Sequence, residues 1–256
     1  MAAALTRGVG GAPYAASGLA EVAPHRSVPW RRLLLLLLLL VLLLGLVGLC
    51  HRSKSLDTLS QGELVGHRSP VPVHLVLLLD ESGSFHDYEQ LRRDVLDQVV
   101  TWAPRNLRPE DTLTVIGFSG DAATRVATTT VAQLDARAPS YLAAGGADGT
   151  KIGPALQLAV DEAAGPAPGP RSLVVLTDTM VEDADRTSAD DLVRRLGATT
   201  MSVIVPSGVE IEDSWSDAFP YESVFEASVD SQDQTALALG RAVAHATGQR
   251  LEAVDG

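Results

Sequence analysis

Five oxygen-bearing side chains, far apart along the chain, fall where apolar runs of the sequence end or where helical spacing begins. Three of them lie in LLLDESGSF, directly after an apolar run, one lies in GGADGTKIGPAL, and one ends LVVLTD. Carboxylates and hydroxyls, without His or Cys, are the ligands of a hard cation such as Mg²⁺. The pattern therefore predicts a metal site, and its ligands are Asp80, Ser82, Ser84, Thr150 and Asp178.

The alternation Asp-x-Ser-x-Ser has a physical reason. In an extended turn alternate side chains point the same way, so Asp80, Ser82 and Ser84 can converge while Glu81 points away. Gly83 is expected to permit the tight backbone path. Two carboxylates balance a divalent charge, and neutral hydroxyls add ligands without further anions. A sixth position is then open to the carboxylate of a partner, which the ion attracts. Mn²⁺ and Ca²⁺ accept the same ligands.

Each residue also has a structural explanation when it is taken alone. Ser84 and Thr150 can cap helices, and Asp178 can be a turn residue. His86 and Asp87, beside the first three, are expected to be surface or capping residues.

An enzyme is the alternative reading of the same residues. A Mg²⁺-dependent phosphohydrolase of the haloacid dehalogenase type would use Asp80 as nucleophile, Lys151 to neutralise phosphate, and Asp178 with Asp183 as metal ligands. Such enzymes carry a general acid two residues after the nucleophile. Ser82 occupies that position and cannot act as an acid at neutral pH, which disfavours catalysis.

The elements that must position these residues follow from the hydrophobic pattern. Short apolar runs predict buried strands, longer stretches with helical spacing predict helices, and the two alternate. This order is typical of an α/β fold with a mainly parallel sheet and helices on both faces. Ligands of such sheets bind beyond the carboxyl ends of the strands, where all five residues fall. The predicted strands are 74–79, 112–118, 122–130, 172–177, 200–205 and 223–227, and the predicted helices are 88–102, 152–164, 189–196 and 235–247.

In these motifs the sequence resembles the von Willebrand factor type A domain. DESGS from Asp80, GTKIGPAL from Gly149 and LTD ending at Asp178 match, in order, the metal-ion-dependent adhesion site of that family. The resemblance covers about residues 74–247. It implies a Rossmann-like fold and adhesion or assembly rather than catalysis. Many members have Gly after the last Asp, whereas Thr179 follows here, which bears on the path of that loop.

The resemblance also implies how each residue meets the ion. It implies direct contact by the three hydroxyls, of Ser82, Ser84 and Thr150, and contact by Asp80 and Asp178 that is often through water. The partner that it implies is a protein presenting an Asp or Glu carboxylate to the ion.

One segment predicts a single transmembrane helix. Leu33–Cys50 has no charged residue, and as a helix it spans about 27 Å, close to the thickness of the bilayer core. The Lys and Arg residues near its two ends are balanced, and the more distant Arg7 favours an N-terminus inside and a domain outside the cell. The expected organisation is a disordered tail (1–32), a transmembrane helix (33–50), a linker (51–72), a type A domain (73–249) and a C-terminal tail (250–256).

Charge and composition exclude some partners. Beyond Leu56 there are 31 acidic and 14 basic side chains, a formal charge of −17, which repels nucleic acid and suits cations or basic partners. Cys50 is the only cysteine, so no disulfide within the chain is possible. The excess of Arg over Lys favours a GC-rich, bacterial origin.

Two loops at the same edge are expected to set partner choice. They are Pro139–Gly149 and Gly208–Glu222. The second contains Trp215, Phe219 and Tyr221, including aromatic types enriched at binding hot spots. The alternative for these aromatic residues is packing against the nearest helix.

Overall fold

The computed structural model describes residues 30, 34–41, 55–84, 89–134, 148–164, 169–219, 221, 223–228 and 230–254. The chain divides into two units, Met1–Arg52 and Ser53–Gly256. In the first unit, residues 34–41 are helical with exposed side chains, and the rest of the predicted membrane segment Leu33–Cys50 lies outside the described residues. A helix with the length and apolar character needed to cross a membrane was not found within the ranges that are described.

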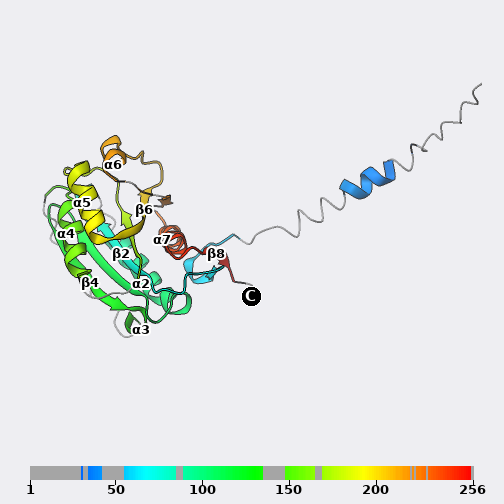
Figure 1. Cartoon of the computed structure of the whole chain (residues 1–256). Coiled ribbons are helices and arrows are strands. Elements are labelled where there is room, and N and C mark those ends of the chain that lie inside the picture. Colours follow the sequence, from blue (N-terminus) through cyan, green and yellow to red (C-terminus); the bar gives the residue numbers. More distant parts are fainter. Residues whose placement is uncertain are drawn as a thin grey trace, which may run out of the picture. The chain divides into compact units, whose positions relative to one another are not determined.

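The second unit is built on a six-stranded sheet. Figure 1 shows this sheet with helices packed around it. The strand order is β4-β3-β2-β5-β6-β7, and all neighbouring strands are parallel except β3 and β4. This confirms the predicted mainly parallel sheet. The strands are β2 (His74–Asp80), β3 (Thr112–Phe118), β4 (Ala122–Thr130), β5 (Arg171–Leu176), β6 (Ala198–Pro206) and β7 (Ser223–Ala227).

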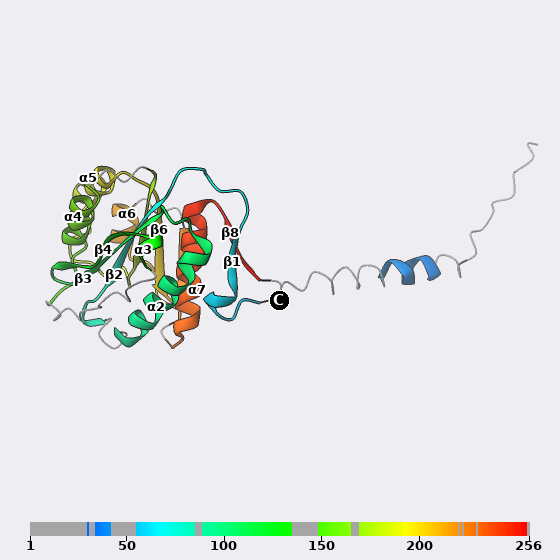
Figure 2. The same cartoon turned by 90° about the horizontal axis from the view of Figure 1, so that it is seen from below.

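Helices cover both faces of this sheet, which confirms the predicted layers (Figure 2). Helices α2, α3 and α7 pack on one face, and α4, α5 and α6 pack on the other. Their bounds are α2 (Glu89–Asn106), α3 (Val131–Leu134), α4 (Gly153–Glu162), α5 (Arg186–Leu196), α6 (Asp213–Ala218) and α7 (Gln232–Thr247).

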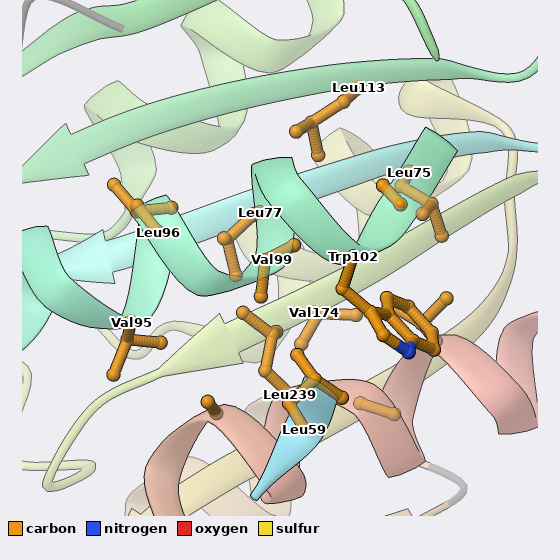
Figure 3. Packing of buried hydrophobic residues seen from close by; sticks show 14 of the residues in the cluster. Leu59, Leu75, Leu77, Val95, Leu96, Val99, Trp102, Leu113, Val174 and Leu239 are labelled. Carbon is orange, nitrogen blue, oxygen red and sulfur yellow. The ribbon is translucent and has the colours of Figure 1, made fainter. Parts of the chain in front are cut away.

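Strand β2 lies at the centre because both of its faces are apolar. Leu75 and Leu77 point to the α2 and α7 side, whereas Val76 and Leu78 point to the α4 and α5 side. Every residue of β2 is buried, and each fully buried Leu contributes roughly 1.5–3 kcal/mol. Figure 3 shows the first side, where these leucines meet Trp102 and other side chains of α2 and α7. The core therefore holds the strand that ends in Asp80.

At both ends of the folded unit, the structure differs from the organisation that was predicted from the sequence. The predicted linker 51–72 contains a short 3-10 helix, η1 (Leu59–Gln61), and a strand, β1 (Gly62–Val65). The predicted tail contains β8 (Arg250–Ala253), which pairs antiparallel with β1. Leu59 is fully buried, and its Cδ1 would lie 2.5 Å from a Cβ built at Gly240 of α7. The folded unit therefore extends beyond 73–249 in both directions.

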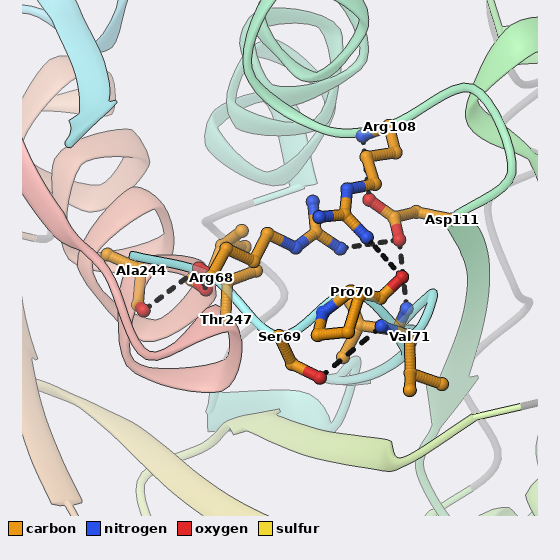
Figure 4. Close-up of polar contacts among 10 residues, drawn as sticks. Arg68, Ser69, Pro70, Val71, Arg108, Asp111, Ala244 and Thr247 are labelled. Carbon is orange, nitrogen blue, oxygen red and sulfur yellow. Dashed lines mark hydrogen bonds and ion pairs between the residues drawn. The ribbon is translucent and has the colours of Figure 1, made fainter. Parts of the chain in front are cut away.

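A buried aspartate fixes the segment that leads into β2. Asp111 accepts hydrogen bonds from the Arg68 guanidinium, from the Val73 N–H (2.8 Å) and from the Arg108 N–H (2.7 Å). Figure 4 shows this cluster, in which Arg108 also donates to the carbonyl of Pro70. A buried charge with this many donors is compensated. The cluster fixes β2 at the end opposite to Asp80.

Candidate metal centre

Asp80 is the last residue of β2, at the carboxyl edge of the sheet, and it is fully buried. Its Oδ1 accepts a hydrogen bond from the Ser82 N–H (2.9 Å), and its Oδ2 accepts one from the Thr177 hydroxyl (2.7 Å). Thr177 directly follows β5, so the carboxylate joins the ends of two neighbouring strands. This role of Thr177 could not be predicted from the sequence, because a single hydroxyl next to Asp178 leaves no pattern of its own.

The hydroxyls of the turn after β2 converge on the same place. Ser82 is buried, and its Oγ lies 3.1 Å from the Oγ of Ser84. Ser84 in turn donates to Oδ2 of Asp178 (2.7 Å). Hydrogen bonds thus bring together Asp80, Ser82, Ser84 and Asp178, which are separated by up to 98 positions in the sequence.

The turn itself is not the extended one that was expected. Gly83 and Ser84 lie in a helical turn, and Gly83 does not have a positive φ. A Cβ built at Gly83 would meet no atom within 4 Å. The convergence of the hydroxyls therefore comes from the curvature of the turn, and nothing in the structure requires glycine at this position.

The loop after β5 keeps an uncommon backbone conformation. Thr179 has a φ of 67° and is fully buried, and it is the one non-glycine residue with positive φ in the described part of the chain. This conformation is strained for a β-branched residue. Thr179 therefore has a backbone conformation that is more typical of glycine. The Met180 N–H can donate to Oδ1 of Asp178 (3.0 Å) as a result of this turn.

Thr150 lies just before α4 and is held by its backbone. The Glu182 N–H donates to the Thr150 carbonyl (2.8 Å), and the Lys151 N–H donates to the carbonyl of Ser119, which follows β3 (2.7 Å). In the described residues no hydrogen bond joins the Thr150 side chain to the other four. Thr150 is therefore at the predicted edge of the sheet, next to the loop that carries Asp178.

Two carboxylates share this site without a cationic side chain. Over the described residues, neither Asp80 nor Asp178 forms an ion pair with Lys, Arg or His. Burial raises the pKa of Asp80, hydrogen bonds from Ser82 and Thr177 lower it, and the charge of Asp178 raises it further. Buried charges in proteins are paired with opposite charges or bind metals. The donor set therefore fits a cation.

A cluster of three or more His, Cys, Asp or Glu side chains able to hold a metal was not found among the residues with described positions. The five predicted ligands include only two such side chains, and the other three are hydroxyls. Oxygen-only sets of this kind suit hard cations.

The residues of the phosphohydrolase alternative are used differently. The Asp183 carboxylate accepts hydrogen bonds from the backbone N–H groups of Ile152 and Gly153, both at 2.8 Å. The Asp183 carboxylate thus binds the backbone at the start of α4, and no contact between Asp183 and Asp178 is seen among the described residues. This arrangement gives no support to a second metal-binding carboxylate.

The neighbours of the site take structural roles. Glu81, which was not expected to be a ligand, forms a bidentate ion pair with Arg125 of β4. Trp215 and Phe219 are buried and pack against each other with ring centroids 4.4 Å apart. This is the packing alternative of the sequence analysis. His86, Asp87 and most of the loop Pro139–Gly149 lie outside the described residues.

Comparison with known proteins agrees with this geometry. Residues 75–180 match the model of the von Willebrand factor type A domain. The matched residues include all five predicted ligands. No curated protein matches the chain in sequence.

Solved structures show the same fold at low identity. Proximal thread matrix protein 1 from the mussel byssus has a TM-score of 0.53 and 15% identity, with 72% of this chain and 49% of that chain covered. A form of it with a zinc-occupied MIDAS motif has a TM-score of 0.51, 15% identity, and coverage of 75% and 49%. A von Willebrand factor type A protein from Catenulispora acidiphila has a TM-score of 0.52, 15% identity, and coverage of 77% and 51%. The matches span about half the length of each of these chains.

Proposed function

We propose that this protein binds a divalent cation at its type A domain and, through the cation, a carboxylate of a protein partner. The proposed ligands are Asp80, Ser82, Ser84, Thr150 and Asp178. Mg²⁺ is the proposed ion because all five ligands are hard oxygens, and Mn²⁺ and Ca²⁺ share that preference. The zinc-occupied motif of the mussel protein adds Zn²⁺ to the ions to be tested.

One observation carries the proposal. Two buried carboxylates, of Asp80 and Asp178, are linked by hydrogen bonds through Ser82 and Ser84, and neither has an ion pair among the described residues. Such an arrangement is costly for two anions alone and favourable around a cation, which offsets both charges. The charge of the cation then attracts a further carboxylate. Binding, rather than catalysis, is the activity that this set supports.

The proposed site of action is the cell membrane. The apolar segment Leu33–Cys50 would hold the chain there by one helix, with the type A domain outside the cell. Fractionation of cells that express the full chain tests this proposal. Recovery in the soluble fraction, or protection of the domain from protease added to intact cells, would contradict it.

Thermal unfolding of the purified full-length chain tests the metal site. After chelation, Mg²⁺, Mn²⁺, Ca²⁺ or Zn²⁺ is added in increasing amounts. We expect the Tm to rise and to follow the concentration of the ion that binds, because a ligand of the folded state stabilises it by mass action. Asp80→Ala is expected to abolish the rise.

A matched control is available on the neighbouring strand. Asp121 is exposed and lies three residues after the end of β3, the strand next to β2. Asp121→Ala removes the same charge and should keep the rise in Tm. An unchanged rise in Asp80→Ala would refute the metal site. Paired peptides with Asp or Asn at one position then test the partner, and equal binding of both would refute the carboxylate.

A further inference from the structure

The start of α4 is capped by a carboxylate from another part of the chain. Ile152, the residue before α4, makes no capping hydrogen bond with its own side chain. Instead, Asp183 accepts the Ile152 N–H at Oδ1 and the Gly153 N–H at Oδ2. A Cβ built at Gly153 would lie 2.8 Å from Oδ2, so the carboxylate lies directly against the first turn. Unpaired N–H groups and the helix dipole favour an anion here.

The residue before Asp183 holds Thr150 itself. The Glu182 N–H donates to the Thr150 carbonyl at 2.8 Å. Gly149 has a φ of 97°, and a Cβ built there would lie 2.8 Å from the Glu182 carboxylate. The segment Thr150–Gly153 is therefore fixed by three hydrogen bonds to two adjacent residues of the loop after β5.

That loop also carries Asp178, so it links two of the three segments of the site. The turn after β2 has its own links to the loop, from Ser84 to Asp178 and from Thr177 to Asp80. Thr150 has no side-chain hydrogen bond to the other candidate ligands within the described ranges. Its place relative to Asp178 depends on the contacts of Glu182 and Asp183.

We propose that Asp183 is a positioning residue of the metal site and that it acts through Thr150. The inference rests on the proposed function. Asp183 does not touch the ion. Its carboxylate holds the first turn of α4 so that the Thr150 hydroxyl stays on the side of Asp178. Metal affinity depends on such supporting contacts, whose removal costs about tenfold to a hundredfold.

Calorimetric titration of the full-length chain with Mg²⁺ measures this effect. We expect Asp183→Ala to weaken Mg²⁺ affinity by about tenfold or more. Asp183→Asn should weaken it less, because the carboxamide oxygen still accepts one of the two N–H groups. Amide exchange of Ile152 and Gly153, measured in chelator, should become faster in both variants.

Asp185 supplies the matched control in the same loop. It caps α5 by accepting the Ser188 N–H (3.0 Å), so Asp185→Ala removes one charge and one helix cap. It should change Mg²⁺ affinity by less than about threefold, since it is an exposed charge screened by salt. Equal losses in Asp183→Ala and Asp185→Ala would overturn the inference.

A double-mutant cycle identifies the route of the effect. Thr150→Val removes the hydroxyl and keeps the shape of the side chain. In that background Asp183→Ala should weaken binding by less than about twofold, because interacting residues are not additive. A full additional loss would show that Asp183 does not act through Thr150 and would overturn the inference. If Asp183→Ala does not fold, Asp183→Asn replaces it in the cycle.

Asp80→Ala distinguishes failure of the proposed metal site from failure of the proposed role of Asp183. Unchanged Mg²⁺ binding in Asp80→Ala would refute the proposed function whatever the Asp183 variants do. Loss of binding in Asp80→Ala together with unchanged binding in Asp183→Ala would refute only the role of Asp183.

Discussion

The hydroxyl of Thr179 accepts a hydrogen bond from the backbone N–H of Glu212, at 3.1 Å. Glu212 is the residue before α6, so this contact joins the loop that follows β6 to the loop that carries Asp178. The Thr179 N–H also donates to the Thr177 hydroxyl (3.0 Å), which donates to Asp80. The strain of Thr179 is thus offset by the contact with Glu212, which glycine could not make.

Loss of this hydroxyl should destabilise the protein. Thr179→Val keeps the β-branched shape and the strain but leaves the Glu212 N–H without its acceptor. We expect the free energy of unfolding to fall by about 1–3 kcal/mol. Thr179→Ser keeps the hydroxyl and should change it by less than about 1 kcal/mol. Urea unfolding measures both values, and equal effects of Val and Ser would show that the contact with Glu212 contributes nothing.

Leu59 should contribute as much to the free energy of unfolding as a leucine of the central sheet. It is fully buried in the segment that packs against α2 and α7, although its surroundings in the sequence are polar. Leu59→Ala should lower the free energy of unfolding by about 2–5 kcal/mol, the usual cost of truncating a core leucine. Val71→Ala, at a position that is 44% exposed, is the control and should cost less than about 1 kcal/mol. A cost for Leu59→Ala no greater than that of the control would mean that this segment does not fold onto the domain.

His74 should make the protein less stable in mild acid. Burial, together with the charge of Arg171, lowers the pKa of His74 from 6.5 to about 4. The folded protein keeps His74 neutral down to a pH of about 4, whereas the unfolded chain takes up the proton near pH 6.5. Between these values the unfolded state binds more protons, so stability decreases as the pH decreases. The expected loss between pH 7.5 and pH 5 is about 2 kcal/mol.

Urea unfolding of the wild type and of His74→Gln at both pH values isolates this contribution. The acidic surface changes stability in both proteins alike, so the difference between them reports His74. The same pH dependence in the two proteins would contradict the assignment.

The ion pair between Glu81 and Arg125 should be costly to break. Both side chains are almost fully buried, with exposed fractions of 4% and 6%. A Cβ built at Gly117 would lie 2.3 Å from the Glu81 carboxyl carbon, so the carboxylate is enclosed. Arg125→Met removes this arginine from the buried carboxylate and should lower the free energy of unfolding by about 3–5 kcal/mol. Glu81→Gln combined with Arg125→Met should lower it by less, because no buried charge then remains at Glu81.

The control is an exposed pair. Arg194 and Asp190 lie one turn apart on α5 with exposed fractions of 68% and 46%. Arg194→Met should cost less than about 1 kcal/mol. Chemical unfolding that finds similar costs for Arg125→Met and Arg194→Met would show that burial does not strengthen the dependence of Glu81 on Arg125.

The central elements could be predicted because their signals are local. The apolar run before Asp80 has no polar face, so it fits only a strand buried on both sides. The alternation of strands and helices then places the carboxyl ends of β2 and β5 at one edge. The proximity of Asp80, Ser82, Ser84 and Asp178 follows from that topology.

Other features could not be predicted because their causes are not local. Strands β1 and β8 are four residues each, and Gly62 meets Ala253 from the other end of the folded unit. The contact of Asp183 is with backbone N–H groups, which leave no trace in residue types. The burial of Trp215 and Phe219 depends on where α6 packs, so the sequence left two alternatives open.

The pairing of β1 with β8 has a mechanical consequence. Gly62 lies opposite Ala253, so β1 begins beside the residue at which β8 ends. In an antiparallel pair joined in this way, pulling the two ends apart loads the outermost hydrogen bonds first, and the pair opens like a zipper, one rung at a time. Tension between the ends would therefore load the buried Leu59 and the pair of β1 and β8 before it reached β2, which ends in Asp80, and β5, which precedes Asp178.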